Sequence, residues 1–145
     1  MKILLPVDGS ALALRAVTVA IGLLQQGLQG SLVLANVQEP ATLYEMVVAA
    51  DGAVLQQVSE AAGIDALQAA EAAVMAAGVV YEREIASGDP AHTIVDICER
   101  FGCDMIVMGA HGTSALRSAL LGSVSNEVLH AATVPVMIVK LEETT

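Results

Sequence analysis

The chain has 145 residues, which suits a single domain with a sizeable core, and we expect one domain over residues 1–145. Hydrophobic residues make up 55% of the chain and aromatic residues only 2%, so the core must be built from Ala, Val, Leu, Ile and Met. The formal net charge of −10 argues against binding to nucleic acid, whose phosphates need a cationic face, and against docking on anionic membranes.

The start of the chain favours a cytoplasmic protein. Asp8 and Arg15 interrupt the short apolar run near the N-terminus, so no signal peptide is evident. Cys98 and Cys103 have neither a disulfide framework nor a zinc spacing, and we expect Cys98, on the apolar side of a predicted helix, to be buried as a small hydrophobic residue.

The first part of the chain predicts a strand followed by a helix. An apolar run over residues 3–7 predicts the strand, and the helix follows from the candidate N-caps Asp8 and Ser10 to about Gly27. The expected inner face of this helix is Leu12, Ala16, Val19, Ala20 and Leu23.

The middle of the chain continues this alternation of apolar runs and helical segments. Residues 31–37 predict a second strand and residues 38–46 a loop. An Ala-rich segment over residues 51–77 predicts a helix that Gly63 bends or interrupts. Residues 79–87 predict a third strand, whose partial alternation of charged and apolar residues is typical of a strand near a sheet edge.

The last part of the chain adds two helices and two strands. The dipeptide Asp89-Pro90 predicts a helix start, with Asp as N-cap and Pro at the first helical position. Residues 104–108 predict the fourth strand, Ser123 caps the last helix, and residues 134–139 predict the fifth strand. The expected inner face of the last helix is Val124, Val128, Leu129 and Ala132.

This order predicts an α/β fold with a parallel sheet, because parallel strands need crossover connections. We expect a three-layer, doubly wound, Rossmann-like sheet of five parallel strands. If the strand order is 3-2-1-4-5, the winding reverses between the first and fourth strands, and ligands bind beyond the carboxyl ends of strands at such a point. The first strand ends at Asp8 and the fourth at Gly109, so a carboxylate and a glycine loop would meet in one crevice.

The most informative motif follows the fourth strand. Gly109 and Gly112 stand two residues apart, and nine further residues lead to Gly122 and Ser123. Glycines let the backbone approach a ligand closely and can take positive φ. The N–H groups at a helix N-terminus favour anions, and the hydroxyls of Ser123 and Ser125 can donate to phosphate oxygens.

Each candidate residue also has a plain structural interpretation. Asp8, which only accepts hydrogen bonds when ionised, suits ribose hydroxyls, but it can also be only a helix cap. The glycines can form only a helix-entry turn. Arg117 can reach a terminal phosphate or lie in solvent, and His111 can act as an acid or base or simply be exposed. His92 and His130 share no ligand spacing, so we expect no zinc site.

The chain resembles the universal stress protein family over essentially its whole length. The resemblance rests on residues 3–10, 104–112, 121–125 and 134–139. The glycine spacing matches the family's ATP-binding signature, which has two residues between the first glycines and nine before a Gly-Ser or Gly-Thr pair.

The resemblance implies an adenine-nucleotide-binding domain, similar to the adenine-nucleotide alpha hydrolases, with sheet order 3-2-1-4-5. It implies that Asp8 contacts ribose, that Val37 lies against adenine through its backbone, and that the last strand, with Val136 and Ile138, pairs two copies into a homodimer. The expected ligand is ATP, ADP or AMP, with Mg²⁺ or Mn²⁺ on the phosphates. The candidate nucleotide-binding residues are Pro6, Val7, Asp8, Val37, Met108, Gly109, His111, Gly112, Arg117, Gly122, Ser123, Val124 and Ser125.

We therefore expect an ATP-binding regulator of the stress response, in which bound nucleotide is a signal that a protein partner of unknown identity reads. Little or no hydrolysis is expected, because the loop has no lysine and no obvious base to orient water. Two alternatives stay open. One is a weak ATPase or nucleotide transferase that uses His111 and Arg117. The other is a nucleotide-free dimeric interaction module.

Overall fold

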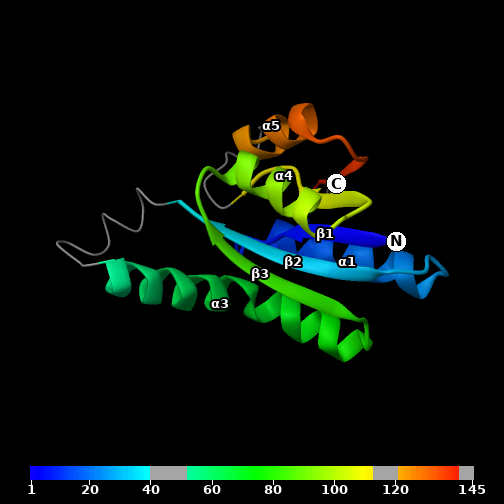
Figure 1. Ribbon diagram of the computed structural model, residues 1–145. Coiled ribbons are helices and arrows are strands. Elements are labelled where there is room, and N and C mark those ends of the chain that lie inside the picture. The colour runs from blue at the N-terminus through cyan, green and yellow to red at the C-terminus, as the bar shows by residue number, and fades with distance from the viewer. Residues whose placement is uncertain (40–51, 113–120, 141–145) are drawn as a thin grey trace, which may run out of the picture.

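The computed structural model describes residues 1–39, 52–112 and 121–140, with the backbone alone for residues 52–56. The predicted loop over residues 38–46 lies mostly outside these ranges, and Arg117 lies outside them entirely. In chain order the elements are β1 (Lys2–Pro6), α1 (Ala11–Gln25), β2 (Ser31–Gln38), α3 (Gly52–Ala77), β3 (Tyr81–Ser87), α4 (Pro90–Arg100), β4 (Met105–Gly109), α5 (Ser123–Ala131) and β5 (Val136–Val139) (Figure 1).

The five described strands form a parallel sheet in the order β3-β2-β1-β4-β5. Helices α1 and α3 cover one face of the sheet, and α4 and α5 cover the other (Figure 1). The predicted three-layer, doubly wound fold and its strand order are therefore confirmed. The winding reverses between β1 and β4, so their carboxyl ends flank the switch point where ligands bind in such sheets.

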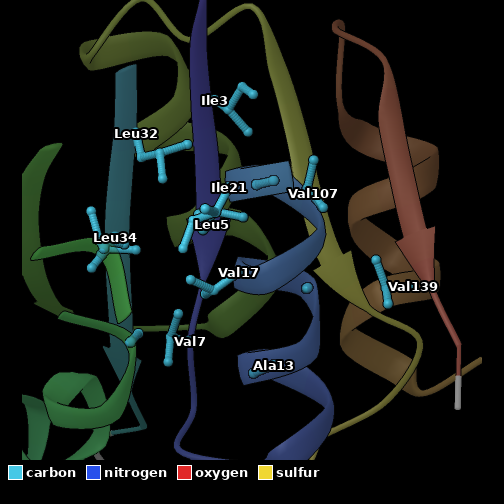
Figure 2. Close-up of a cluster of buried hydrophobic side chains, with 14 of the residues drawn as sticks. Ile3, Leu5, Val7, Ala13, Val17, Ile21, Leu32, Leu34, Val107 and Val139 are labelled. Carbon is cyan, nitrogen blue, oxygen red and sulfur yellow. The ribbon is translucent and has the colours of Figure 1, made fainter. Parts of the chain in front are cut away.

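The core has two apolar layers, one on each face of the sheet. On β1, Ile3 and Leu5 pack towards α1 and α3, whereas Leu4 packs towards α4 and α5. Figure 2 shows the first layer, in which Val17 and Ile21 of α1 lie against the strands. Period-two alternation along buried strands produces these two layers, because successive side chains point to opposite faces.

Two expected helix faces differ from the structure in part. The buried face of α1 consists of Leu12, Ala13, Ala16, Val17, Ala20 and Ile21. Val19 and Leu23 are only partly buried, because α1 is apolar on several sides and periodicity alone does not fix which side meets the sheet. On α5, Leu129 was expected inside but is 42% exposed, since this short helix buries only Ser125 and Val128.

Helix α3 is continuous at Gly63, so the glycine does not interrupt it. A Cβ atom at residue 63 would lie 2.5 Å from Cγ2 of Ile85, so the glycine allows α3 to approach β3 closely. The long helix and this edge strand are thus in direct contact.

Strand β3 lies at the edge of the sheet, as its alternation predicts. On one side, Tyr81 and Arg83 each hydrogen-bond to the Glu71 carboxylate of α3, at 2.9 Å and 2.9 Å. On the other side, Glu84 pairs with Arg100 of α4 at 3.4 Å. Its polar side chains therefore tie this strand to the helices on both faces.

Both cysteines are buried, which confirms the interpretation of Cys98 as a small hydrophobic residue. The Cys98 thiol donates to the Cys103 carbonyl over 3.8 Å. Among the helices of the described ranges, none combines the length and the apolar character that crossing a membrane requires.

Candidate functional site

A cavity of about 520 Å³ lies at the carboxyl ends of β1, β2 and β4. The starts of α1, α4 and α5 complete its walls. Its lining residues are Pro6, Val7, Asp8, Ala13, Ala35, Val37, Glu39, Pro90, Ile94, Met108, Gly109, His111, Gly112, Gly122, Ser123, Val124 and Ser125. This volume lies within the usual range for small-molecule sites, and the cavity occupies the topological switch point.

The candidate residues from the sequence that the structure describes all line this cavity. Those from β1 and β2 are Pro6, Val7, Asp8 and Val37, and those from β4 onward are Met108, Gly109, His111, Gly112, Gly122, Ser123, Val124 and Ser125. Sequence reasoning missed Ala13, Ala35, Glu39, Pro90 and Ile94. Alternation along β2 could have found Ala35 and Glu39, because they flank Val37 at a spacing of two residues.

The Asp8 carboxylate is not the cap of α1. Its Oδ1 atom accepts a hydrogen bond from the Ser10 N–H at 3.0 Å, while Ser10 Oγ accepts from the Ala13 N–H at 3.1 Å and caps the helix. Gly9 makes the turn between them with φ of 86°, a conformation that favours glycine. This turn directs the exposed Asp8 side chain to the cavity rather than to the helix.

The three signature glycines stand where other parts of the chain approach closely. A Cβ atom would lie 2.5 Å from Asp8 Oδ2 at Gly112, 3.0 Å from the Leu12 side chain at Gly109, and 3.2 Å from His111 Cα at Gly122. Positive φ, which glycine permits, is not used at these three positions. Their lack of a side chain brings the glycine loop, the end of β1 and the start of α5 together.

Helix α5 begins at the cavity without a side-chain cap. Its N-cap is Gly122, so the prediction that Ser123 caps this helix is wrong: Ser123 is the first helical residue. The Gly122 N–H donates to the Ala110 carbonyl at 2.8 Å, which fixes the helix start beside β4. The first N–H groups of a helix lack intrahelical acceptors and carry the positive end of its dipole, so this end can bind an anion.

The two serines of the motif differ in what their hydroxyls do. Ser125 is 2% exposed, and its hydroxyl contacts the carbonyls of Ala110 at 2.5 Å and Gly122 at 3.1 Å. Its only donor hydrogen is thus directed into the protein, contrary to the prediction that it donates to phosphate. Ser123 is exposed at the cavity and keeps the predicted position. Spacing placed both serines at the helix start but did not indicate which hydroxyl points inward.

The described lining of the cavity contains two carboxylates, Asp8 and Glu39, the imidazole of His111, and no Lys or Arg. The half-buried His111 has its Nδ1 atom 3.4 Å from the Gly112 carbonyl oxygen. Over the described residues there is no group of three His, Cys, Asp or Glu side chains that could hold a metal ion. Among the described residues, those that could hold an anion in this cavity would do so chiefly through their backbone N–H groups.

The doubly wound sheet and the cavity at its switch point define a Rossmann-like α/β domain with a candidate small-molecule site. Residues 1–140 match the model of the universal stress protein family, and the chain belongs to this family.

Relatives with established family names cover nearly the whole chain. Universal stress protein YxiE of Bacillus subtilis (strain 168) is 30% identical over 146 residues, which cover 96% of this chain and 98% of YxiE. The solved structure of MJ0577, a universal stress protein of Methanocaldococcus jannaschii, has a TM-score of 0.81 and 26% identity, and the match covers 99% of this chain and 97% of that chain. A universal stress protein solved in complex with cAMP has a TM-score of 0.62 and 25% identity, with 97% of this chain and 96% of that chain covered.

Proposed function

We propose that this protein binds an adenine nucleotide in the cavity and that the bound nucleotide acts as a regulatory signal. The observation that carries the proposal is the meeting of Asp8, the bare backbone of Gly112 and the uncapped start of α5 around one cavity. The relative in complex with cAMP, which matches nearly this whole chain, supports an adenine nucleotide as the ligand class.

The distribution of polar and apolar groups in the cavity favours one orientation of the nucleotide, with its base beside β2 and its phosphates at the start of α5. Ala35, Val37, Pro90 and Ile94 make an apolar end beside β2 that suits the base. Asp8, at the end of the neighbouring strand β1, then faces the sugar hydroxyls as an acceptor. The phosphates reach the start of α5, where each hydrogen bond to a charged group contributes on the order of 1.5–3 kcal/mol.

The charge of the cavity bears on which nucleotide binds. Two carboxylates line it, and ATP brings more negative charge than ADP or AMP. Backbone N–H groups and the helix dipole offset part of this charge. Mg²⁺ or Mn²⁺ fits the described residues only as an ion that arrives with the phosphates, since Mg²⁺ is commonly bound through one or two carboxylates plus substrate phosphates. The Asp8 carboxylate and the Ser123 hydroxyl are described side-chain oxygen ligands at the phosphate end of the cavity.

Hydrolysis is slow or absent in this proposal. Phosphoryl transfer needs a positioned water and cations that stabilise the developing charge, and the described lining offers neither Lys nor Arg. His111 is the residue that an ATPase or transferase would use as an acid or base. Turnover that His111→Ala removes, with nucleotide affinity retained, would favour the enzyme over the regulator.

The proposal includes a homodimer through β5, which would act in the cytoplasm in the stress response together with a regulatory protein partner. Strand β5 lies at an edge of the sheet, and Val136 and Ile138 are half-buried there. Beside them, Met137 is 37% exposed and Leu129 of α5 is 42% exposed. An apolar sheet edge needs covering, and a second copy would cover it. Sedimentation of the wild type and of an Ile138→Lys variant tests the dimer.

The direct test of nucleotide binding is mass spectrometry of any small molecule released from the purified protein, followed by calorimetry with Mg-ATP, AMP and cAMP. Gly122→Val is expected to abolish the binding heat, because its side chain would collide with the His111 backbone at the helix start. Gly22→Ala on α1, where a Cβ atom meets nothing within 4 Å, is the control. Wild-type protein that releases no nucleotide and gives no heat would contradict the proposal and favour the nucleotide-free interaction module.

A further inference from the structure

The hydrogen-bond ladder between β1 and β2 stops one bond early at the cavity. The Ser31 N–H donates to the Met1 carbonyl at one end of the pair, and the Val7 N–H donates to the Ala35 carbonyl at the other. The odd-numbered residues of β2 therefore face β1, and in a parallel ladder the next bond would run from the Val37 N–H to the Val7 carbonyl. No hydrogen bond joins these two described groups.

The side chain of Asn36 takes the acceptor that this missing bond would use. Its Nδ2 atom donates to the Val7 carbonyl oxygen at 2.8 Å, and its Oδ1 atom accepts from Nε2 of Gln38 at 2.5 Å. A carbonyl oxygen can only accept a hydrogen bond, so the NH2 end of the Asn36 side chain, and not its oxygen, must face Val7. Asn36 is 2% exposed, and both ends of its buried amide are bonded, so its orientation is strongly determined.

Asn36 does not itself line the cavity, because side chains alternate along β2. Ala35 and Val37 line the cavity, whereas the Asn36 side chain points to the opposite face of the sheet. Its effect on the cavity is therefore indirect. By occupying the Val7 carbonyl, it leaves the Val37 N–H directed towards β1, along the floor of the cavity and without a ladder partner.

We propose that Asn36 is a positioning residue that keeps the Val37 N–H unpaired and presented to the ligand. The inference rests on the proposed function for its ligand, which must place a hydrogen-bond acceptor such as a ring nitrogen against Val37. Without the Asn36 amide, the Val7 carbonyl would be free to accept the Val37 N–H. The ladder would then close, and the donor would be lost to the ligand.

Residue-resolved amide hydrogen exchange tests this without any substitution. In the ligand-free wild type, the Val37 amide is expected to exchange faster than the Ala35 amide, which lies within the ladder. Addition of AMP is expected to slow exchange at Val37. A ligand-free protein in which Val37 exchanges as slowly as Ala35 would overturn the proposal.

The Asn36→Leu variant then removes the side-chain N–H donor to the Val7 carbonyl and keeps a side chain of similar volume. Val37 exchange is expected to slow in the ligand-free variant, and AMP affinity is expected to fall about tenfold, in line with the loss of one hydrogen bond of about 1.4 kcal/mol. Ser59→Ala is the matched control: it removes a buried hydroxyl that hydrogen-bonds with Ser87 Oγ at 3.2 Å, and it should change neither quantity.

A folded Asn36→Leu variant with unchanged AMP affinity and unchanged Val37 exchange would overturn the role of Asn36. If Leu is not tolerated, Asn36→Ala replaces it, because alanine has no side-chain donor for the Val7 carbonyl. Wild-type protein that binds no adenine nucleotide would contradict the proposed function instead. Exchange in the ligand-free protein would then still decide whether Asn36 keeps the Val37 N–H unpaired.

Discussion

The Oδ2 atom of Asp8 lies 2.5 Å from the position that a Cβ atom of residue 112 would occupy, so the Asp8 carboxylate uses the space left by Gly112. Asp8 follows β1 and Gly112 follows β4, and these two strands pair within the sheet. The second glycine of the signature thus makes room for the acid at the end of the first strand, and the two features form one unit.

Gly112→Ala is expected to push the Asp8 carboxylate out of its position and to weaken adenine-nucleotide binding about tenfold, which corresponds to about 1.4 kcal/mol. In an Asp8→Ala background the same substitution should add little, because the group that it displaces is gone. Calorimetry on the four proteins measures this coupling. Equal losses in both backgrounds would show that Gly112 acts independently of Asp8.

Ser125→Ala is expected to lower the free energy of unfolding by about 1–2 kcal/mol, because it leaves the buried Ala110 carbonyl without this hydroxyl donor. Ser123→Ala, at an exposed position, should change the unfolding free energy by less than about 0.5 kcal/mol. Denaturant titrations of both variants measure the difference. Similar values for the two would contradict the different roles of these hydroxyls.

The exposed pair Asp89 and His92 predicts a defined pH dependence. A hydrogen bond from His92 Nδ1 to Asp89 Oδ2, 2.7 Å long, raises the pKa of His92 above its usual 6.5 and lowers the pKa of Asp89 below its usual 3.8. The contribution of His92 to stability is present below pH 6.5 and is lost as pH rises through its raised pKa. That of Asp89 is present above pH 3.8 and is lost as pH falls through its lowered pKa, so the pair contributes fully between these values.

An NMR titration of His92 checks this. Asp89→Asn should lower the pKa of His92 while keeping the helix cap, because Asn caps helices as well as Asp does. Glu127→Gln should lower it less, because the charge of Glu127 is a smaller cause of the shift. An unchanged His92 titration in Asp89→Asn would contradict the structure here.

Cys103 is expected to react slowly with thiol reagents in the native protein. Burial raises its pKa from 9.0 to about 11, so at pH 8 its thiolate fraction is roughly a hundredfold smaller than that of an unperturbed thiol. Burial also raises the pKa of Cys98. Mass spectrometry after timed alkylation, with and without denaturant, measures both rates. Labelling of the native protein as fast as that of the denatured chain would contradict this expectation.

Much of the fold could be predicted from the sequence, because its signals are local and strong. Solid apolar runs become buried strands, and Asp89 before Pro90 caps α4 by accepting from the His92 N–H at 3.1 Å, as predicted. The alternation of strands and helices then limits the topology, and the family resemblance supplies the strand order. The cavity follows from that order, since the ends of β1 and β4 must meet.

The predictions that failed, and the contacts that sequence reasoning did not find, depend on where side chains point in space, which residue spacing does not encode. A sequence places Ser125 one turn into a helix but does not indicate that its hydroxyl points back to Ala110. Glycine disfavours helix, yet Gly63 lies within α3 and leaves room for the side chain of Ile85, a residue far away in the chain. The bond from Asn36 to the Val7 carbonyl depends on two strands lying side by side, so no local pattern reveals it.

The Ala110 carbonyl accepts from both the Gly122 N–H and the Ser125 hydroxyl, so the first turn of α5 is fastened directly to the residue that follows β4. A change in the direction of this carbonyl would therefore shift the first turn of α5 as well. The position of the uncapped N–H groups at the start of the helix is in this way coupled to the backbone at the end of β4.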